Sequence, residues 1–119
     1  RSVVKTIAGD GSALAADGVG TFASFGESVG VAVTPDGKLA LVSDKGSHMI
    51  RRVTLATGDV TTLAGTGTPG FVDSSLGPPA VAPELNAPVG IVVERDGLSA
   101  VFCDSQNHRI RRIVLSSGF

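Results

Sequence analysis

Short apolar runs separated by polar turn residues follow one another along the whole chain. Runs rich in Val, Ile, Leu and Ala that are bounded by Gly, Pro or Asp predict β-strands. These runs seldom alternate cleanly between apolar and polar positions, which is typical of strands buried on both faces. Only residues 21–25 and 82–85 suggest a short helical turn. The predicted strands are residues 2–8, 30–34, 39–43, 49–55, 60–64, 90–94, 99–103 and 109–115.

This pattern occurs twice. Residues 29–55 (VGVAVTPDGKLALVSDKGSHMIRRVTL) match residues 89–115 (VGIVVERDGLSAVFCDSQNHRIRRIVL) position by position. The matched residues lie 60 positions apart (90 − 30, 104 − 44 and 108 − 48), as in Gly30 and Gly90, Asp44 and Asp104, and His48 and His108. A constant spacing over so many positions indicates an internal repeat, which determines the fold class before any single motif does.

Each copy carries an Asp-Gly pair between two of its predicted strands, at Asp36-Gly37 and at Asp96-Gly97. Apolar runs on either side of Asp-Gly are a strong signal for a β-hairpin. Each unit therefore contains short antiparallel strands with tight turns, four to a unit when the run after the third strand is included. Four-stranded units that repeat and stack face to face are typical of β-propeller blades.

The connectors are where the two copies differ. Residues 9–28 and 65–88 are both rich in Gly, Ser, Pro and small residues, and the second connector is four residues longer. A tolerated change of length is typical of surface loops, and loops this long often carry recognition. Apolar side chains are expected to anchor them: Leu14, Phe22, Phe25, Phe71, Val81 and Leu85. The candidate binding residues of the connectors are Phe22, Phe25, Phe71 and Asp73.

The second copy resembles the NHL repeat, a family of β-propeller blades. The resemblance rests on residues 88–93 (PVGIVV), Asp96-Gly97 and residues 104–113 (DSQNHRIRRI). The first copy departs from the family pattern in its loop, where Ser47 and Met49 replace Asn and Arg, and at Ser28, which replaces Pro. The resemblance covers essentially the whole chain. It implies an all-β fold with about two four-stranded antiparallel blades of a larger propeller, commonly one of six blades.

The repeat also predicts the blade boundaries. Residues 1–58 would hold the fourth strand of a preceding blade and the first repeat, with strands in 29–55, and residues 59–119 the fourth strand of blade one and the second repeat, with strands in 89–115. Two blades cannot close a ring. The remaining blades would come from the rest of a longer chain, which we favour, or from head-to-tail self-assembly that pairs residues 2–8 with residues 109–115 of the next copy.

Charged residues recur at matching places in both copies. An Asp and a His four positions apart can suggest metal binding or acid–base chemistry. Because a catalytic centre is needed only once, the recurrence favours a structural role. Adjacent strand residues point to opposite faces, so one Arg of each Arg-Arg pair should face the core. Ion pairs are predicted between Asp44 and Arg52 and between Asp104 and Arg112. The structural repeat positions are Asp44, His48, Arg52, Asp104, His108 and Arg112.

Composition narrows the function classes. The net charge is −1, the chain has no Trp or Tyr, and it has only five Phe. These features disfavour nucleic-acid binding, which wants a basic face and stacking aromatic residues. No apolar run approaches the roughly 20 residues that a membrane helix needs. Cys103 is the only cysteine and is expected to be a small buried residue; the cysteine count slightly favours the cytoplasm over a secreted location.

The sequence contains no recognisable catalytic, metal-binding or phosphate-binding motif. We therefore expect a non-catalytic β-propeller scaffold or protein-interaction module with a protein partner and no cofactor. The resemblance leaves an alternative, because related propellers include lactonase-like and lyase-like enzymes that hold a metal in the central channel. Single-stranded RNA binding, known for some family members, is a third hypothesis.

Overall fold

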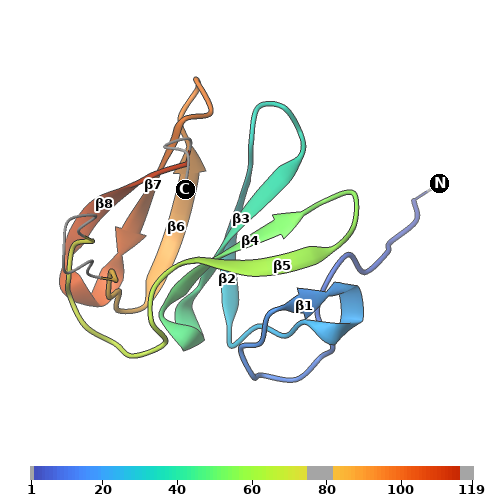
Figure 1. The fold of residues 1–119 in the computed structure, drawn as a ribbon, viewed down its shortest axis with the longest axis horizontal. Coiled ribbons are helices and arrows are strands. Elements are labelled where there is room, and N and C mark those ends of the chain that lie inside the picture. The colour runs from blue at the N-terminus through green and yellow to red at the C-terminus, as the bar shows by residue number, and fades with distance from the viewer. Residues whose placement is uncertain (1, 75–81, 116–119) are drawn as a thin grey trace.

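The chain forms two antiparallel sheets that stack face to face (Figure 1). A computed structural model describes residues 2–74 and 82–115. Blade one is the sheet β1-β5-β4-β3-β2 and blade two is the sheet β6-β7-β8. The strands are β1 Gly18–Val19, β2 Ser28–Val33, β3 Leu39–Asp44, β4 Met49–Thr54, β5 Asp59–Ala64, β6 Pro88–Val93, β7 Ser99–Asp104 and β8 Arg109–Val114.

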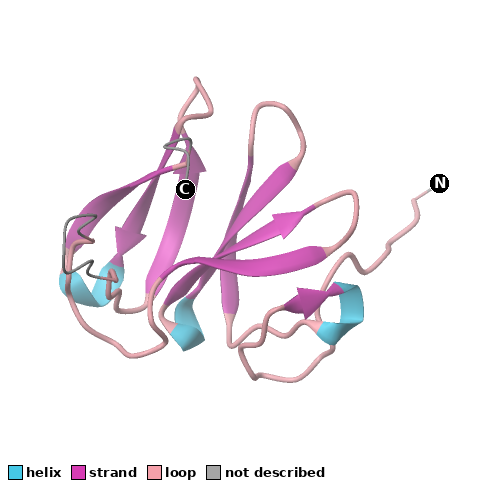
Figure 2. Cartoon of the chain, viewed as in Figure 1, coloured by secondary structure: helices cyan, strands magenta, loops and turns pink. Residues whose placement is uncertain are grey.

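Three short 3₁₀ turns complete the described elements (Figure 2). They are η1 Gly20–Phe22, η2 Lys45–Ser47 and η3 Ser105–Asn107. The predicted turn around residues 21–25 corresponds to η1, whereas residues 82–85 contain only a single antiparallel bridge, between Glu84 and Val72. The all-β, two-blade fold predicted from the repeat is confirmed.

The two ends of the blades carry different structures, as Figure 1 shows. The hairpin turns β2–β3 and β6–β7 lie side by side at one end, which we call the hairpin rim. The turns η2 and η3 lie at the opposite end with the connector segments next to them, and we call this end the connector rim. The turn η1 of the first connector lies instead beside the β4–β5 turn, where the N–H of Gly20 donates to the carbonyl oxygen of Gly58 at 2.8 Å. Gly37 and Gly97 both have φ of 75°, a conformation that glycine adopts without steric cost, and this explains the Asp-Gly signal in each hairpin.

The main core lies between the blades. Burying an aliphatic or aromatic side chain of this size contributes roughly 1.5–3 kcal/mol, so this cluster is the principal attachment of one sheet to the other. Its fully buried members are Leu41, Ile50 and Ala64 from blade one and Leu85, Ile91, Ala100 and Phe102 from blade two. A second cluster lies on the other face of blade one, where Ala23 and Phe25 of the first connector cover Val42, Val53 and Val60, with Ala8 packed beside them.

The innermost strands approach very closely. A Cβ atom at Gly30 of β2 would collide with the carbonyl oxygen of Val89 in β6. The matching Gly90 has only the Cys103 sulfur near it, at 3.8 Å from an added Cβ. The same glycine therefore has a packing reason in blade one that it does not have in blade two.

The outward face of blade two and the β2 part of the outward face of blade one remain exposed, and this corrects the expectation that the strands are buried on both sides. The central strand β3 is buried along almost its whole length, whereas β2 and β8 alternate. The apolar residues exposed on the outer faces include Val31 and Val33 of β2 and Val92, Ile110 and Val114 of blade two. Cys103, predicted to be buried, is exposed because it lies on the outer face of β7, opposite the core residue Phe102.

The predicted strand over residues 2–8 is not formed. Val3 and Val4 are 73% and 96% exposed, and no described strand lies beside them to supply ladder hydrogen bonds. A two-residue strand that was not predicted, β1, pairs instead with β5 through Gly18 and Val60. The division of the chain at residues 58 and 59 stays a prediction.

Candidate functional site: the arginine clips of the connector rim

Each blade holds its connector through one buried arginine, and we call this arrangement an arginine clip. In blade one, Arg51 Nη1 donates to Asp44 Oδ2 at 3.2 Å and to the carbonyl oxygen of Ser24 at 2.9 Å. Arg51 Nη2 donates to Asp17 Oδ1 at 3.0 Å. The Arg51 side chain is 1% exposed and that of Asp44 is fully buried. The guanidinium thus joins the third strand of the blade to two points of the preceding connector.

Blade two repeats the clip with different residues. Arg111 Nη1 donates to Asp104 Oδ2 at 2.9 Å and to the carbonyl oxygen of Glu84 at 2.7 Å. Arg111 Nη2 donates to Asp73 Oδ1 at 2.9 Å and to the carbonyl oxygen of Val72 at 2.7 Å. The connectors differ in sequence and in length, yet both end in the same hydrogen-bonding pattern.

The clips correct the predicted ion pairs, which were placed one residue too far along the chain. Val42 pairs with Arg51 across the β3–β4 ladder, and Asp44 lies on the same face of β3 as Val42. Arg52 pairs with Leu41 on the opposite face and donates from Nε to Thr61 Oγ1 at 3.3 Å. The predicted pair between Asp44 and Arg52 is therefore wrong.

The same error occurs in blade two, where the pair between Asp104 and Arg112 is wrong. Phe102 pairs with Arg111, which places Arg111 on the face of Asp104. Arg112 points to the outer face and binds Glu94, with Nε 2.7 Å from Glu94 Oε1. Because the Arg112 side chain is 62% exposed, this outer pair is worth at most about 1 kcal/mol.

Asp44 also fixes the end of its connector through backbone hydrogen bonds. Its two carboxylate oxygens accept from the N–H of Glu27 at 2.6 Å and the N–H of Gly26 at 2.9 Å. Burial alone would raise the pKa of Asp44, but these two N–H groups, together with Ser47 and Arg51, lower it below the ordinary value. Asp44 is therefore held as a carboxylate inside the blade.

Asp104 keeps one of the two backbone contacts and replaces the other: the N–H of Ala87, which matches that of Glu27, donates to His48 instead. Its oxygens accept from the N–H of Asn86 and from Asn107 Nδ2, each at 2.7 Å. Asn107 Nδ2 also donates to the carbonyl oxygen of Gly70 at 2.8 Å, so this side chain joins η3 to the longer connector. Ser47 occupies the matching place in blade one and is too short for such a contact with its connector.

The two histidines have the same backbone conformation and different contacts. His48 and His108 end η2 and η3 with φ of 59° and 54°, in the left-handed region. His48 Nδ1 accepts the N–H of Ala87 at 3.0 Å, so its ring reaches the connector of the other blade. The His108 ring is exposed, and within residues 2–74 and 82–115 it makes no hydrogen bond.

The candidate phenylalanines differ in exposure. Phe22 is 85% exposed. The ring of Phe25 is half-buried, with its centroid 5.1 Å from the guanidinium carbon of Arg51. The ring centroid of Phe71 lies 4.0 Å from the guanidinium carbon of Arg109. Phe25 and Leu85, both predicted as anchors, pack against the blades. Leu14 and Phe22 point to solvent instead, which corrects the prediction that they anchor the connector. Val81 falls outside the described residues.

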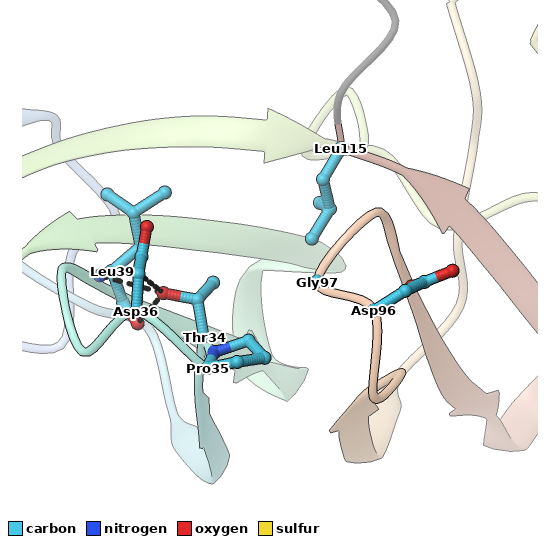
Figure 3. A pocket seen from close by; sticks show the side chains of 7 residues that line it. All are labelled: Thr34, Pro35, Asp36, Leu39, Asp96, Gly97 and Leu115. Atoms are coloured by element: carbon cyan, nitrogen blue, oxygen red, sulfur yellow. Dashed lines mark hydrogen bonds between the residues drawn. The ribbon is translucent and has the colours of Figure 1, made fainter.

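A hollow of about 290 Å³ lies between the two hairpin turns, at the rim opposite the clips (Figure 3). The two carboxylates of the hollow make hydrogen bonds within their own hairpin turns. Asp36 Oδ1 accepts from Thr34 Oγ1 and from the N–H of Lys38, and Asp96 Oδ1 accepts from the N–H of Leu98. The two carboxylates do not converge in Figure 3. The residues that line the hollow are Thr34, Pro35, Asp36, Leu39, Asp96, Gly97 and Leu115.

The described residues contain no group of three His, Cys, Asp or Glu side chains placed to hold a metal ion. Across residues 2–74 and 82–115 no helix has the length and apolar character needed to cross a bilayer. The clips and the joint between the blades position the backbone and the connectors.

Comparison with known proteins agrees with this architecture. The chain is 34% identical over 102 residues to Protein SUPPRESSOR OF QUENCHING 1, chloroplastic, of Arabidopsis thaliana, and 34% identical over 101 residues to human NHL repeat-containing protein 2. These matches cover 86% and 85% of this chain but only 9% and 14% of the relatives. No family model matches the chain.

Solved structures show the same fold. An auxiliary nutrient binding protein from Bacteroides thetaiotaomicron matches with a TM-score of 0.72 and 30% identity, over 86% of this chain and 26% of that one. The PQQ-bound aldose sugar dehydrogenase of Streptomyces coelicolor matches with a TM-score of 0.54 and 25% identity, over 98% and 28%.

The stacked antiparallel blades and these matches define a β-propeller protein. Within that class the chain belongs to the NHL-repeat propellers, as the motif in residues 104–113 and the similarity to NHL repeat-containing protein 2 show. The predicted resemblance is confirmed.

Proposed function

We propose that these blades form a non-catalytic scaffold that presents its connectors to a protein partner. The observation that carries the proposal is the exposed Phe22, which sits on a connector whose flanks are fastened by Asp17 and Ser24 to buried Arg51. A large apolar side chain on a fixed support loses little conformational freedom on binding. Propeller loops held in this way are suited to protein recognition.

The test compares two exposed apolar residues, one on the first connector and one in a hairpin turn of the other blade. Phe22→Asp should abolish capture of the partner from an extract of the source organism, measured by quantitative mass spectrometry. Leu98→Asp is the matched control, because Leu98 is 50% exposed in the β6–β7 turn of the hairpin rim. Thermal unfolding of both variants must match that of the unmodified chain. Loss of the same proteins in both variants, or in neither, would overturn the proposal.

The alternative function is a part of a propeller enzyme with a metal in the central channel. The similarity to the PQQ-bound aldose sugar dehydrogenase supports the enzyme part of this alternative. Elemental analysis of the full-length protein, purified without chelators, would distinguish the two proposals. One tightly held metal per chain that is required for an activity would favour the enzyme, and a metal-free protein that binds its partner would favour the scaffold.

A further inference from the structure

The hydrogen bond between His48 and Ala87 crosses the joint between the blades. It links the end of η2 in blade one to the residue before β6, 39 positions later in the chain. The Ala87 N–H can be accepted only by an unprotonated Nδ1, so the ring must be neutral with its proton on Nε2. A protonated imidazole would direct a second donor at the same N–H.

The Ala87 amide has His48 as its acceptor, whereas the matching N–H of Glu27 in blade one donates to Asp44. Ala87 is 5% exposed, so water has little access to it. Its φ of 58° is unusual for a residue with a Cβ atom and persists only where the surroundings enforce it. Those surroundings are the hydrogen bonds that its carbonyl oxygen accepts from Ser105, through Oγ at 2.6 Å and through the backbone N–H at 3.3 Å.

We propose that His48 is a pH-sensitive latch between the two blades. The neutral ring accepts the Ala87 N–H across the joint, and protonation removes this hydrogen bond and lets the segment before β6 open locally. This inference concerns the joint between the blades and is independent of the proposed partner surface. Imidazoles in general change charge between about pH 5 and 8, and the latch is tested across that range.

The direction follows from the charge state. The hydrogen bond across the joint forms only with an unprotonated Nδ1, whereas the opened joint accommodates either protonation state of the ring. The released form therefore binds more protons, and docking strengthens as pH rises and weakens as pH falls.

Other charged groups around the ring are engaged elsewhere. Asp44 and Lys45 precede it on its own turn, and the carboxylate of Asp44 is occupied by Gly26, Glu27 and Arg51. Asp104 and Arg111 of blade two bind each other, and Glu84 lies on the connector against Gly70. Gly65 and Ala87 both lie against His48, and their neighbours in the chain are uncharged: Ala64, Thr66, Asn86 and Pro88. Among the described residues, no carboxylate oxygen lies within 4.0 Å of the His48 ring nitrogens.

The sequence offers a matched control in His108. It has the same place in its repeat and the same left-handed backbone, but its ring makes no hydrogen bond within the described residues. Asn also adopts the left-handed conformation with little cost and does not titrate, so His48→Asn and His108→Asn remove one imidazole each and leave the turn intact.

The experiment is amide hydrogen exchange of the ¹⁵N-labelled chain by NMR at pH 7.5 and 5.5, corrected for intrinsic exchange rates. In the unmodified chain and in His108→Asn, protection of the Ala87 amide should fall about tenfold or more at the lower pH. In His48→Asn, its protection should be the same at both values. An equal fall in all three proteins would overturn the proposal.

A second measurement needs no variant. Long-range ¹H–¹⁵N spectra of the unmodified chain should show the His48 proton on Nε2 at pH 7.5. The chemical shift of the Ala87 amide should titrate with the same midpoint as the His48 ring. A proton on Nδ1, or an amide that titrates with a different midpoint, would exclude the latch even if His48→Asn failed to fold.

Discussion

Arg51 and Arg111 each hold a positive charge almost completely out of water. Burying such a charge is costly unless its donors meet acceptors, and each clip supplies the Nη groups with a buried carboxylate, a carbonyl oxygen and a carboxylate at the surface. Among the described residues Arg51 Nε has no hydrogen-bond partner. The exposed members, Asp17 and Asp73, are 53% and 81% accessible and contribute less than the buried pairs. At the scale of the residue, each connector is held by the hydrogen bonds that it makes with one buried guanidinium.

Replacing adjacent arginines of β4 separates the buried pair from the outer one. Arg51→Met should destabilise the fold by about 3 kcal/mol, because Asp44 stays buried without its counter-charge. Arg52→Met should change stability by at most about 1 kcal/mol, because Arg52 gives only a 3.3 Å hydrogen bond to Thr61. Urea unfolding monitored by circular dichroism gives both values. A larger cost for Arg52→Met would mean that the strand register is wrong.

Asp44 should also shape the acid limb of the stability profile. Its pKa is lowered in the folded state, so its contribution is present above its unfolded pKa and is lost as pH falls through the lowered folded value. Asp44→Asn should therefore lower stability at neutral pH and flatten the profile below about pH 4. Urea midpoints measured between neutral and acidic pH test this. An unchanged slope at low pH in the variant would show that other carboxylates control acid unfolding.

The position of the clip could have been derived from the sequence with one further step. Asp44 ends β3 and Met49 begins β4, and the two residues pair across the turn. Two residues further along each strand, Val42 faces Arg51, which brings Arg51 to the face of Asp44. Without this count the two adjacent arginines are indistinguishable. The outer partners, Asp17 and Asp73, lie 34 and 38 residues away, and no local pattern specifies such contacts.

At the scale of the element, the strands of the repeat were predictable because each is bounded by its own turn chemistry. The runs at 39–43, 49–55, 60–64, 99–103 and 109–115 agree with β3, β4, β5, β7 and β8 to within one residue at each end. Residues 2–8 failed because a strand needs a neighbour, and β-branched composition alone does not provide one. β1 was missed because Gly18 and Val19 carry no strand signal apart from the edge of β5 with which they pair.

The close approach of β2 and β6 gives the two glycines of the repeat different requirements. Gly30→Ala should destabilise the chain by roughly 1–3 kcal/mol, because the new methyl group meets a backbone carbonyl that cannot move aside easily. Gly90→Ala should be close to neutral, since the nearest atom is a side-chain sulfur at 3.8 Å. Thermal unfolding of the two variants decides the matter, and equal destabilisation would contradict the asymmetry between the blades.

At the scale of the whole molecule, the outer faces of the two blades expose apolar side chains, as faces that pack against a neighbouring blade do. The outer face of blade two exposes Val92 at 67% and Ile110 at 68%, and Val31 on the outer face of blade one is 65% exposed. The inner faces of the two sheets pack against each other. Apolar sheet faces of this kind favour a covering partner, and a further blade has the matching shape.

Contact between copies of the chain through these faces should depend on their apolar residues. We expect sedimentation velocity of the 119-residue chain to show species larger than 11.9 kDa as concentration rises. Val92→Lys combined with Ile110→Lys should shift them to the monomer, whereas Leu98→Lys on the hairpin rim should not. A monomer at every concentration would assign the covering role to other blades of a longer polypeptide.

The clips also separate the length of a connector from the geometry of its blade. Seven positions separate Asp17 from Ser24, and eleven separate Asp73 from Glu84 (24 − 17 and 84 − 73), so the four additional residues fall between two points that the same arginine holds. Lengthening a loop whose ends are fixed costs only about 0.6 kcal/mol for each doubling. A foreign peptide inserted between Asp73 and Glu84 would therefore have both of its flanks bound by Arg111.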